Sequence, residues 1–396
     1  MAARPAIDDE ARRRRLQRRH LLAVNSRATT VTAAADAVVG LHATTASTVY
    51  LSAWARVDGF EPDAMDDALY TDRTLVKQLA MRRTLFVFGH DTLAEAIGAV
   101  GPRVTASERT NMLRDLRRSP DFDDPEGWID AARAAVLADL ADGTARTSTE
   151  LRARNPALDG HIVFGEGKSW GGRTAMGPRV LNMMSAAGEI VRGPNSGRWT
   201  LSRPSWVSMQ SWLGHPLPQV SAADGHRALI RRWLRTFGPG TETDIVWWLG
   251  STKRAVRAAL ADLDVVEVDL DGGSVGYVLA DDVPGTTASD DDVEPQAALL
   301  PELDPATMGW KQRGFYLGDH AAQIFDSNGN GGQSAWWDGR IVGGWRQVDG
   351  GRIEVQTFET VSREAARALA ARADELAEWL GETRLTAGYP APFMKR

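Results

Sequence analysis

The chain has 396 residues, of which 43% are hydrophobic and 25% charged, an ordinary globular composition with room for roughly two to four domains. It contains no cysteine, which excludes disulfides, thiolate catalysis and zinc fingers. Its seven histidines show no paired metal-ligand spacing, and we expect neither a metal nor a cofactor. The net charge of −6 argues against a protein that coats nucleic acid nonspecifically.

The amino terminus carries acids and an arginine cluster where a secretion signal would carry an apolar core. No apolar run reaches the roughly 18 residues of a membrane span. We therefore expect a cytoplasmic protein that makes no contact with a membrane.

The first predicted unit covers residues 1–123. Apolar periodicity predicts helices over residues 18–24, 31–39 and 46–57, a further helix over 66–79, and a β-strand over 84–88. A stretch with two prolines, residues 119–125, separates this unit from the next.

The second predicted unit covers residues 124–215. Helices are expected over residues 129–140, 148–154 and 173–188, followed by a hairpin of strands 190–192 and 198–201 around a glycine-bearing turn. The order of three helices and a hairpin is that of a winged helix.

The third predicted unit, residues 216–290, repeats this order most regularly. An amphipathic helix over residues 226–234 ends at the Gly-Pro-Gly of residues 238–240, and Thr241 or Thr243 is placed to cap a short helix over 244–248. A third helix starts at Ser251, and strands 265–270 and 275–279 form a hairpin. Trp233, Trp247 and Trp248 are predicted core residues.

The last predicted unit, residues 291–396, follows an acidic stretch, residues 281–294, that is typical of a solvated loop. Short β-runs between glycine-rich turns predict a small β-barrel or sandwich, and residues 364–380 a closing amphipathic helix. The predicted fold class is therefore α+β, with three tandem winged-helix domains followed by this β-domain.

Positive charge is concentrated in the first 119 residues of the chain. Residues 1–119 carry 18 Lys and Arg against 14 Asp and Glu, whereas the rest of the chain carries 28 against 38. Clustered arginines neutralise phosphates, although such a run is as often a solvated helix face. The candidate DNA contacts are the N-terminal arginine cluster, two arginines just before the β-strand expected over residues 84–88, and cations on the third helices expected in the second and third units. They are Arg12, Arg13, Arg14, Arg15, Arg18, Arg19, Arg82, Arg83, Arg173, Arg179, Lys253 and Arg254.

The most informative candidate site is the segment 40–51. His42 and Thr44 stand two residues apart on a short non-helical stretch, so both can face one side. A helix begins directly behind them, and Thr44 or Thr45 is a natural N-cap, which is also the alternative explanation of these threonines. His42 can equally be a histidine bonded to the backbone ahead of a helix. No nucleotide-binding loop or hydrolase elbow motif occurs elsewhere.

Five segments carry a resemblance to a known family: residues 40–56, 81–85, 238–250, 299–305 and 339–345. Together they resemble the winged-helix DNA glycosylases of the AlkZ and YcaQ type, over nearly the whole chain. The resemblance implies a concave body that embraces double-stranded DNA and excises N7-alkylguanine adducts, including interstrand crosslinks, to leave an abasic site.

The catalytic motif of that family is Gln-x-Gln or Gln-x-Asp ahead of a helix, and it falls by position on His42-Ala43-Thr44. The resemblance thus implies that His42 and Thr44 are the catalytic residues, although both differ from the motif. An N7-alkylated guanine is a good leaving group, so the enzyme has only to position water and stabilise the sugar cation. No lysine lies in the motif, so we expect a monofunctional glycosylase. We also expect the protein to be a monomer and, as a DNA-binding protein, to be associated with the nucleoid.

Two other classes of protein remain open at this stage. A non-catalytic DNA-binding protein or transcriptional regulator would share the winged helices, and a protein-interaction scaffold would suit the acidic rear of the chain. Salt-dependent affinity for DNA separates the first of these from the second.

Overall fold

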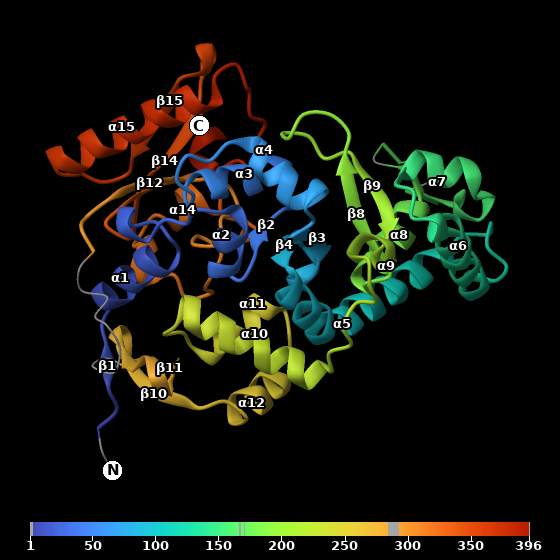
Figure 1. Cartoon of the computed structure of the whole chain (residues 1–396), viewed down its shortest axis with the longest axis horizontal. Coiled ribbons are helices and arrows are strands. Elements are labelled where there is room, and N and C mark those ends of the chain that lie inside the picture. The colour runs from blue at the N-terminus through green and yellow to red at the C-terminus, as the bar shows by residue number, and fades with distance from the viewer. Residues whose placement is uncertain (1–2, 166–167, 170, 284–292, 396) are drawn as a thin grey trace.

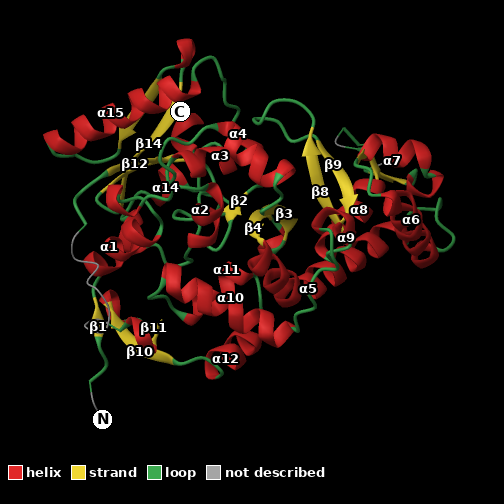
Figure 2. Cartoon of the chain, in the orientation of Figure 1, coloured by secondary structure: helices red, strands yellow, loops and turns green. Residues whose placement is uncertain are grey.

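The structure is a computed structural model that describes residues 3–165, 168–169, 171–283 and 293–395. Helices predominate, and the described strands form five small sheets between them (Figure 2). The α+β class is confirmed, whereas the division into winged-helix domains stays a prediction. The predicted boundary at residue 290 and most of the acidic stretch lie outside the described residues.

The front of the chain holds β1 (Ala6–Ile7), α1 (Asp9–Arg19), α2 (Val31–Ala37), β2 (Leu41–His42), α3 (Ala46–Trp54), α4 (Pro62–Asp66), β3 (Leu75–Leu79), β4 (Leu85–Gly89) and α5 (His90–Leu116). The helix expected over residues 66–79 is wrong in its second half. Arg73 leaves the helical region with a φ of 56°, and β3 then pairs antiparallel with β4. Strands β2, β4 and β3 form one sheet in that order.

The middle of the chain holds α6 (Pro125–Asp139), β5 (Arg146–Thr147), α7 (Ser148–Arg154), β6 (His161–Phe164), β7 (Gly172–Ala175), α8 (Gly177–Ala186), β8 (Ile190–Asn195), β9 (Pro204–Ser208) and α9 (Met209–Leu213). Helix α7 matches its prediction. The strand expected at 198–201 is wrong, because β8 pairs instead with β9, whose Trp206 and Val207 are buried while Leu201 is exposed.

The third unit holds α10 (Ala222–Phe237), α11 (Glu242–Leu249), α12 (Lys253–Ala261), β10 (Val265–Leu270) and β11 (Val275–Leu279), in the predicted order. Thr241 caps α11 reciprocally with Asp244, and Thr252 caps α12. Strand β1 pairs in parallel with β10, so the amino terminus joins a hairpin far along the chain (Figure 1).

The C-terminal unit holds β12 (Ala297–Leu300), α13 (Gly314–Leu317), α14 (Ala321–Ile324), β13 (Ser334–Trp337), β14 (Arg340–Gln347), β15 (Ile353–Thr357) and α15 (Arg363–Leu380). Its described strands form one open antiparallel sheet with α15 packed against it (Figure 1). The expected barrel or sandwich is therefore wrong. The short β-runs expected over residues 314–317 and 321–325 form the short helices α13 and α14 instead.

Two main hydrophobic cores hold the described residues together. The larger one includes side chains from the first unit, the third unit and the C-terminal sheet, and α10 packs closely along α5. A second core, which contains Ile129, Val136 and Val180, fills most of the middle unit, and α5 connects it to the rest (Figure 1). Strands β8 and β9 and helix α9 of the middle unit also contribute Val191, Val207 and Trp212 to the larger core. None of the described helices combines the length and apolarity that crossing a membrane requires.

Candidate active site and DNA interface

The His42–Thr44 segment lies at one edge of the β2-β4-β3 sheet. His42 pairs with Phe86 of β4, and the amide of Ala43 donates to the carbonyl of Leu85 at 2.8 Å. The chain enters this strand through Val39, whose φ of 65° is unfavourable for a β-branched residue. Backbone strain of this kind persists only where the surrounding structure enforces it.

His42 is almost completely buried, with 2% of its surface exposed. Its ring lies 4.8 Å from that of Phe86, centroid to centroid, and its Nδ1 has no hydrogen-bond partner. Burial, aided by the charge of Arg82, lowers the pKa of His42 to about 3. The imidazole is therefore neutral at physiological pH, and it can accept a hydrogen bond but not supply a proton.

Thr44 is partly exposed, and its hydroxyl oxygen accepts the amide hydrogen of Leu85 at 3.4 Å. Thr45 occupies the N-cap position of α3, but its side chain makes no capping hydrogen bond. Neither threonine therefore acts as the helix cap that the sequence suggested.

Helix α3, directly behind the motif, is fixed by a buried ion pair from the C-terminal unit. Arg56 and Asp304 are both fully buried and form two hydrogen bonds, of 2.6 and 2.8 Å. Ser52 donates to the same carboxylate at 2.7 Å, and Thr48 donates to the carbonyl of Glu302 at 3.1 Å. Two of the segments that carry the family resemblance thus meet here.

The turn between β3 and β4 places two of the predicted DNA contacts. Arg82 and Arg83 have φ values of 53° and 60°, so two successive arginines occupy a conformation that favours glycine and asparagine. Arg83 is ion-paired with Glu108 at 2.5 Å and remains 53% exposed. Arg82 lies over the indole of Trp247, at 4.1 Å from the ring centroid.

The arginines of α1 do not form one exposed basic face. Arg12 is buried over the ring of Phe315, and Arg15 is buried against Asp282 at 3.1 Å. The expectation of DNA contact does not fit these two, because their guanidiniums are turned into the protein. The remaining cluster members keep some exposure but also have partners within the chain: Arg13 with the Phe315 carbonyl, Arg14 with Glu10, and Arg19 with Asp282.

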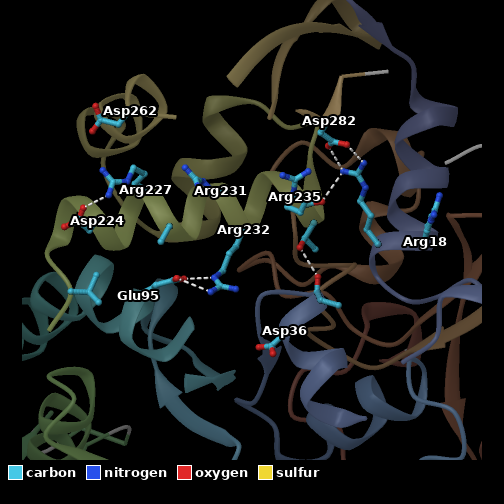
Figure 3. A pocket seen from close by; sticks show the side chains of 15 residues that line it. Arg18, Asp36, Glu95, Asp224, Arg227, Arg231, Arg232, Arg235, Asp262 and Asp282 are labelled. Carbon is cyan, nitrogen blue, oxygen red and sulfur yellow. Dashed lines mark hydrogen bonds and ion pairs between the residues drawn. The ribbon is translucent and has the colours of Figure 1, made fainter. Parts of the chain in front are cut away.

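Arg18 and Arg19 line a cavity of about 1220 Å³ along α10 (Figure 3). It also contains Arg227, Arg231 and Arg235, which are spaced four residues apart on one face of that helix. This spacing is visible in the sequence, yet none of the three is among the predicted contacts. Acidic residues line the same cavity and balance most of this charge through the pairs Arg19–Asp282, Arg227–Asp224 and Arg232–Glu95, while Arg235 pairs with Asp281 just outside it.

The other predicted contacts are dispersed. Lys253 and Arg254 are exposed in the first turn of α12. Arg173 is exposed on strand β7, not on the expected third helix, and Arg179 pairs with Asp115. Within the described part of the chain, no group of three or more His, Asp or Glu is arranged to hold a metal ion.

Comparison with known proteins decides the family. A model of the family described as DNA glycosylase AlkZ-like matches residues 35–379. The chain belongs to the AlkZ-like DNA glycosylase family. The structure of Streptomyces sahachiroi DNA glycosylase AlkZ matches with a TM-score of 0.71 over 96% of this chain and 98% of that one, at 20% identity, and so shares its fold. No curated protein matches the chain.

Proposed function

We propose that this AlkZ-like family member is a monofunctional DNA-repair glycosylase that acts on N7-alkylated purines in double-stranded DNA. Hydrolysis of the N-glycosidic bond would release the base and leave an abasic site in an intact strand. The observation that carries the proposal is the motif position: a neutral histidine lies two residues from a partly exposed threonine, on an edge strand that the chain enters through the strained Val39.

The chemistry requires little acid catalysis. The bond between C1′ and N9 breaks, its electron pair neutralises the cationic base, and a water oxygen bonds to C1′ while one proton is lost to solvent. The neutral imidazole of His42 accepts a hydrogen bond from that water, and Thr44 holds the water through its hydroxyl. With a pKa of about 3, His42 orients the water and does not carry its proton away.

The surrounding elements support the same assignment. Lys77 of β3 and Leu41 of β2 both pair with Val87 of β4, so these residues share one face of the sheet. His42 pairs with the neighbouring residue Phe86 and therefore projects from the opposite face of the sheet to Lys77. This placement supports a hydrolytic and not a lyase reaction.

We also infer that the units 1–123, 124–215 and 216–290 are winged-helix domains, because each places helices ahead of an antiparallel strand pair.

A non-catalytic DNA-binding protein is the second candidate, favoured by the burial of His42. The test compares wild type with His42→Ala and Thr44→Ala on a duplex with a single N7-methylguanine, scoring free base by chromatography and DNA binding by anisotropy. Base release that depends on both residues supports the glycosylase. Binding without base release supports the second candidate.

A further inference from the structure

Trp247 of α11 stands apart from the other tryptophans of its unit. Trp233 and Trp248 are buried as predicted, whereas Trp247 packs against the same core with its indole partly exposed. Two guanidinium groups lie on it: that of Arg82 at 4.1 Å and that of Arg313 at 4.9 Å from the ring centroid. Residues far apart in sequence thus build one cationic cluster on an aromatic ring.

Neither arginine has a carboxylate partner within the described part of the chain. Arg82 makes no hydrogen bond there, and only its Nε is sealed from solvent without a partner. Arg313 donates from Nε to the carbonyl of Trp310 at 2.8 Å and rests on the ring of Phe325 at 4.0 Å, which leaves its terminal nitrogens unengaged. By contrast, the nearby Arg83 is ion-paired.

Holding two such cations together is unfavourable in the free protein. Burial and, next, the charge of Arg313 lower the pKa of Arg82 to about 10. The backbone of Arg82 adds strain, since its φ is 53° in a turn where the next residue is equally strained. An anion bound to these guanidiniums would offset the repulsion, and planar guanidinium groups match phosphate geometry through paired N–H donors.

We propose that Arg82 and Arg313, supported by Trp247, bind a phosphodiester of the DNA strand next to the His42–Thr44 segment. The inference rests on the proposed function, because it assigns the bound anion to the substrate backbone. The position of this phosphate follows from the sheet. Arg82 lies in the turn just before β4, and His42 pairs with Phe86, the second residue of β4. Anchoring this phosphate holds the adjacent sugar against the motif.

The test measures binding without turnover. A labelled duplex with a tetrahydrofuran abasic analogue is titrated by anisotropy at several salt concentrations with wild type, Arg82→Gln, Arg313→Gln and the double variant. Each single substitution is expected to reduce the slope of log K against log salt by about 0.9, and the double by no more than about twice that. Arg313→Lys keeps the charge and should keep the slope.

A matched control is Arg372→Gln. Arg372 also lies on an indole, that of Trp54 at 3.8 Å, but it is ion-paired with Glu375 on α15. Its removal should leave the slope unchanged. In a second arm, single phosphates beside the abasic analogue are replaced by neutral methylphosphonates, and one position should weaken wild type but not Arg313→Gln.

The outcomes separate the two proposals. A reduced slope together with a coupled phosphate supports the site even if no base is ever excised, in which case only the glycosylase proposal fails. Unchanged slopes in Arg82→Gln and Arg313→Gln, with no coupled phosphate, overturn the site even if excision is normal.

Discussion

At the scale of single residues, the proposed site depends on an imidazole kept neutral by its surroundings. The Nδ1 of His42 is buried without a hydrogen-bond partner, and burying a polar group in this way is costly. The positive charge of Arg82 helps to lower the pKa of His42, and Arg82 also forms part of the cationic cluster on Trp247.

Replacing His42 by Ala should lower kcat for N7-methylguanine release by about 10²- to 10³-fold, since a water-positioning group is lost. Affinity for the abasic duplex should change little. Single-turnover kinetics with anisotropy measure both quantities. His215→Ala is the control, because His215 is exposed and, among the described residues, its ring interacts with the Pro216 carbonyl and the His90 ring. Equal rates for wild type and His42→Ala would remove His42 from the mechanism.

The rate of base release should also be independent of pH from about 5 to 9. A histidine with a pKa of about 3 stays neutral throughout that range, so its charge does not change. Initial rates in constant-ionic-strength buffers give the profile. A rate that rises through pH 6 to 7 with the ordinary ionisation of histidine would contradict the neutral role.

His20 provides a separate prediction about acid stability. It is fully buried beside Phe237 and Trp310, and burial, with the charges of Arg56 and Arg19, lowers its pKa far below the usual value. The unfolded chain therefore binds more protons than the folded chain below pH about 6.5, and stability falls as pH drops.

The slope attributable to His20 is about 1.4 kcal/mol per pH unit over this range. His20→Phe keeps the aromatic packing and removes the titration. Urea unfolding at pH 7 and pH 5 should show a smaller loss of stability in the variant than in wild type. An equal loss in the two proteins would show that His20 does not titrate as described.

At the scale of elements, α3 is held by side chains from the other end of the chain. Arg56 and Asp304 are both fully buried, and Asp304 also accepts the amide hydrogen of Ala306 at 2.9 Å. The pair connects the helix behind the motif to the segment after β12. Misplacing that helix would move Thr44 and Thr45, so stability and catalysis are coupled at this point.

Asp304→Asn should destabilise the protein by about 3 to 5 kcal/mol, because it leaves the buried guanidinium of Arg56 without its counter-charge. The free energy of unfolding in urea measures the effect. Asp130→Asn serves as the matched control: its pair with Arg109 is 64% exposed on the aspartate side, so about 1 kcal/mol or less is expected. Similar losses in both variants would contradict the importance of the buried pair.

Local signals predicted several helices well, although the helix expected over residues 18–24 is wrong, because α1 ends at Arg19. Residues 148–154 form the predicted helix with a Thr147–Glu150 capping box, and the three helices and hairpin of the third unit lie where the pattern placed them. Elements that depend on distant partners were missed: β9 replaces the expected strand because Trp206 packs into the middle core. The same applies to the site, where Asp304 and Arg313 reach the motif region only through the fold.

At the scale of the whole molecule, the sequence suggested consecutive units, whereas the cores group them differently. The first unit, the third unit and the C-terminal sheet share one core, to which β8, β9 and α9 of the middle unit also contribute, whereas α6, α7 and α8 of the middle unit pack around a second core. Sequence periodicity reveals which face of a helix is buried, but not which partner covers it. The local pattern singled out His42 and Thr44 as a candidate pair, and the resemblance to a family then implied their catalytic role.

Because α6 and α8 pack in the second core, we predict that they can lose stability independently of the helices in the larger core. Val136→Ala, at a fully buried position of the middle core, should lower hydrogen-exchange protection in α6 and α8 and leave α10 unchanged. Leu229→Ala in the shared core should have the reverse effect. Hydrogen exchange with mass spectrometry of the full chain measures both. Loss of protection everywhere in both variants would show a single cooperative unit.

The glycosylase assignment is tested most directly by the intact mass of a duplex strand bearing one N7-methylguanine after incubation with the protein. We predict loss of the modified base with the backbone unbroken, and loss of this activity in a His42→Ala, Thr44→Ala double variant that still binds the duplex. An unchanged strand mass at protein concentrations that saturate binding would contradict the assignment.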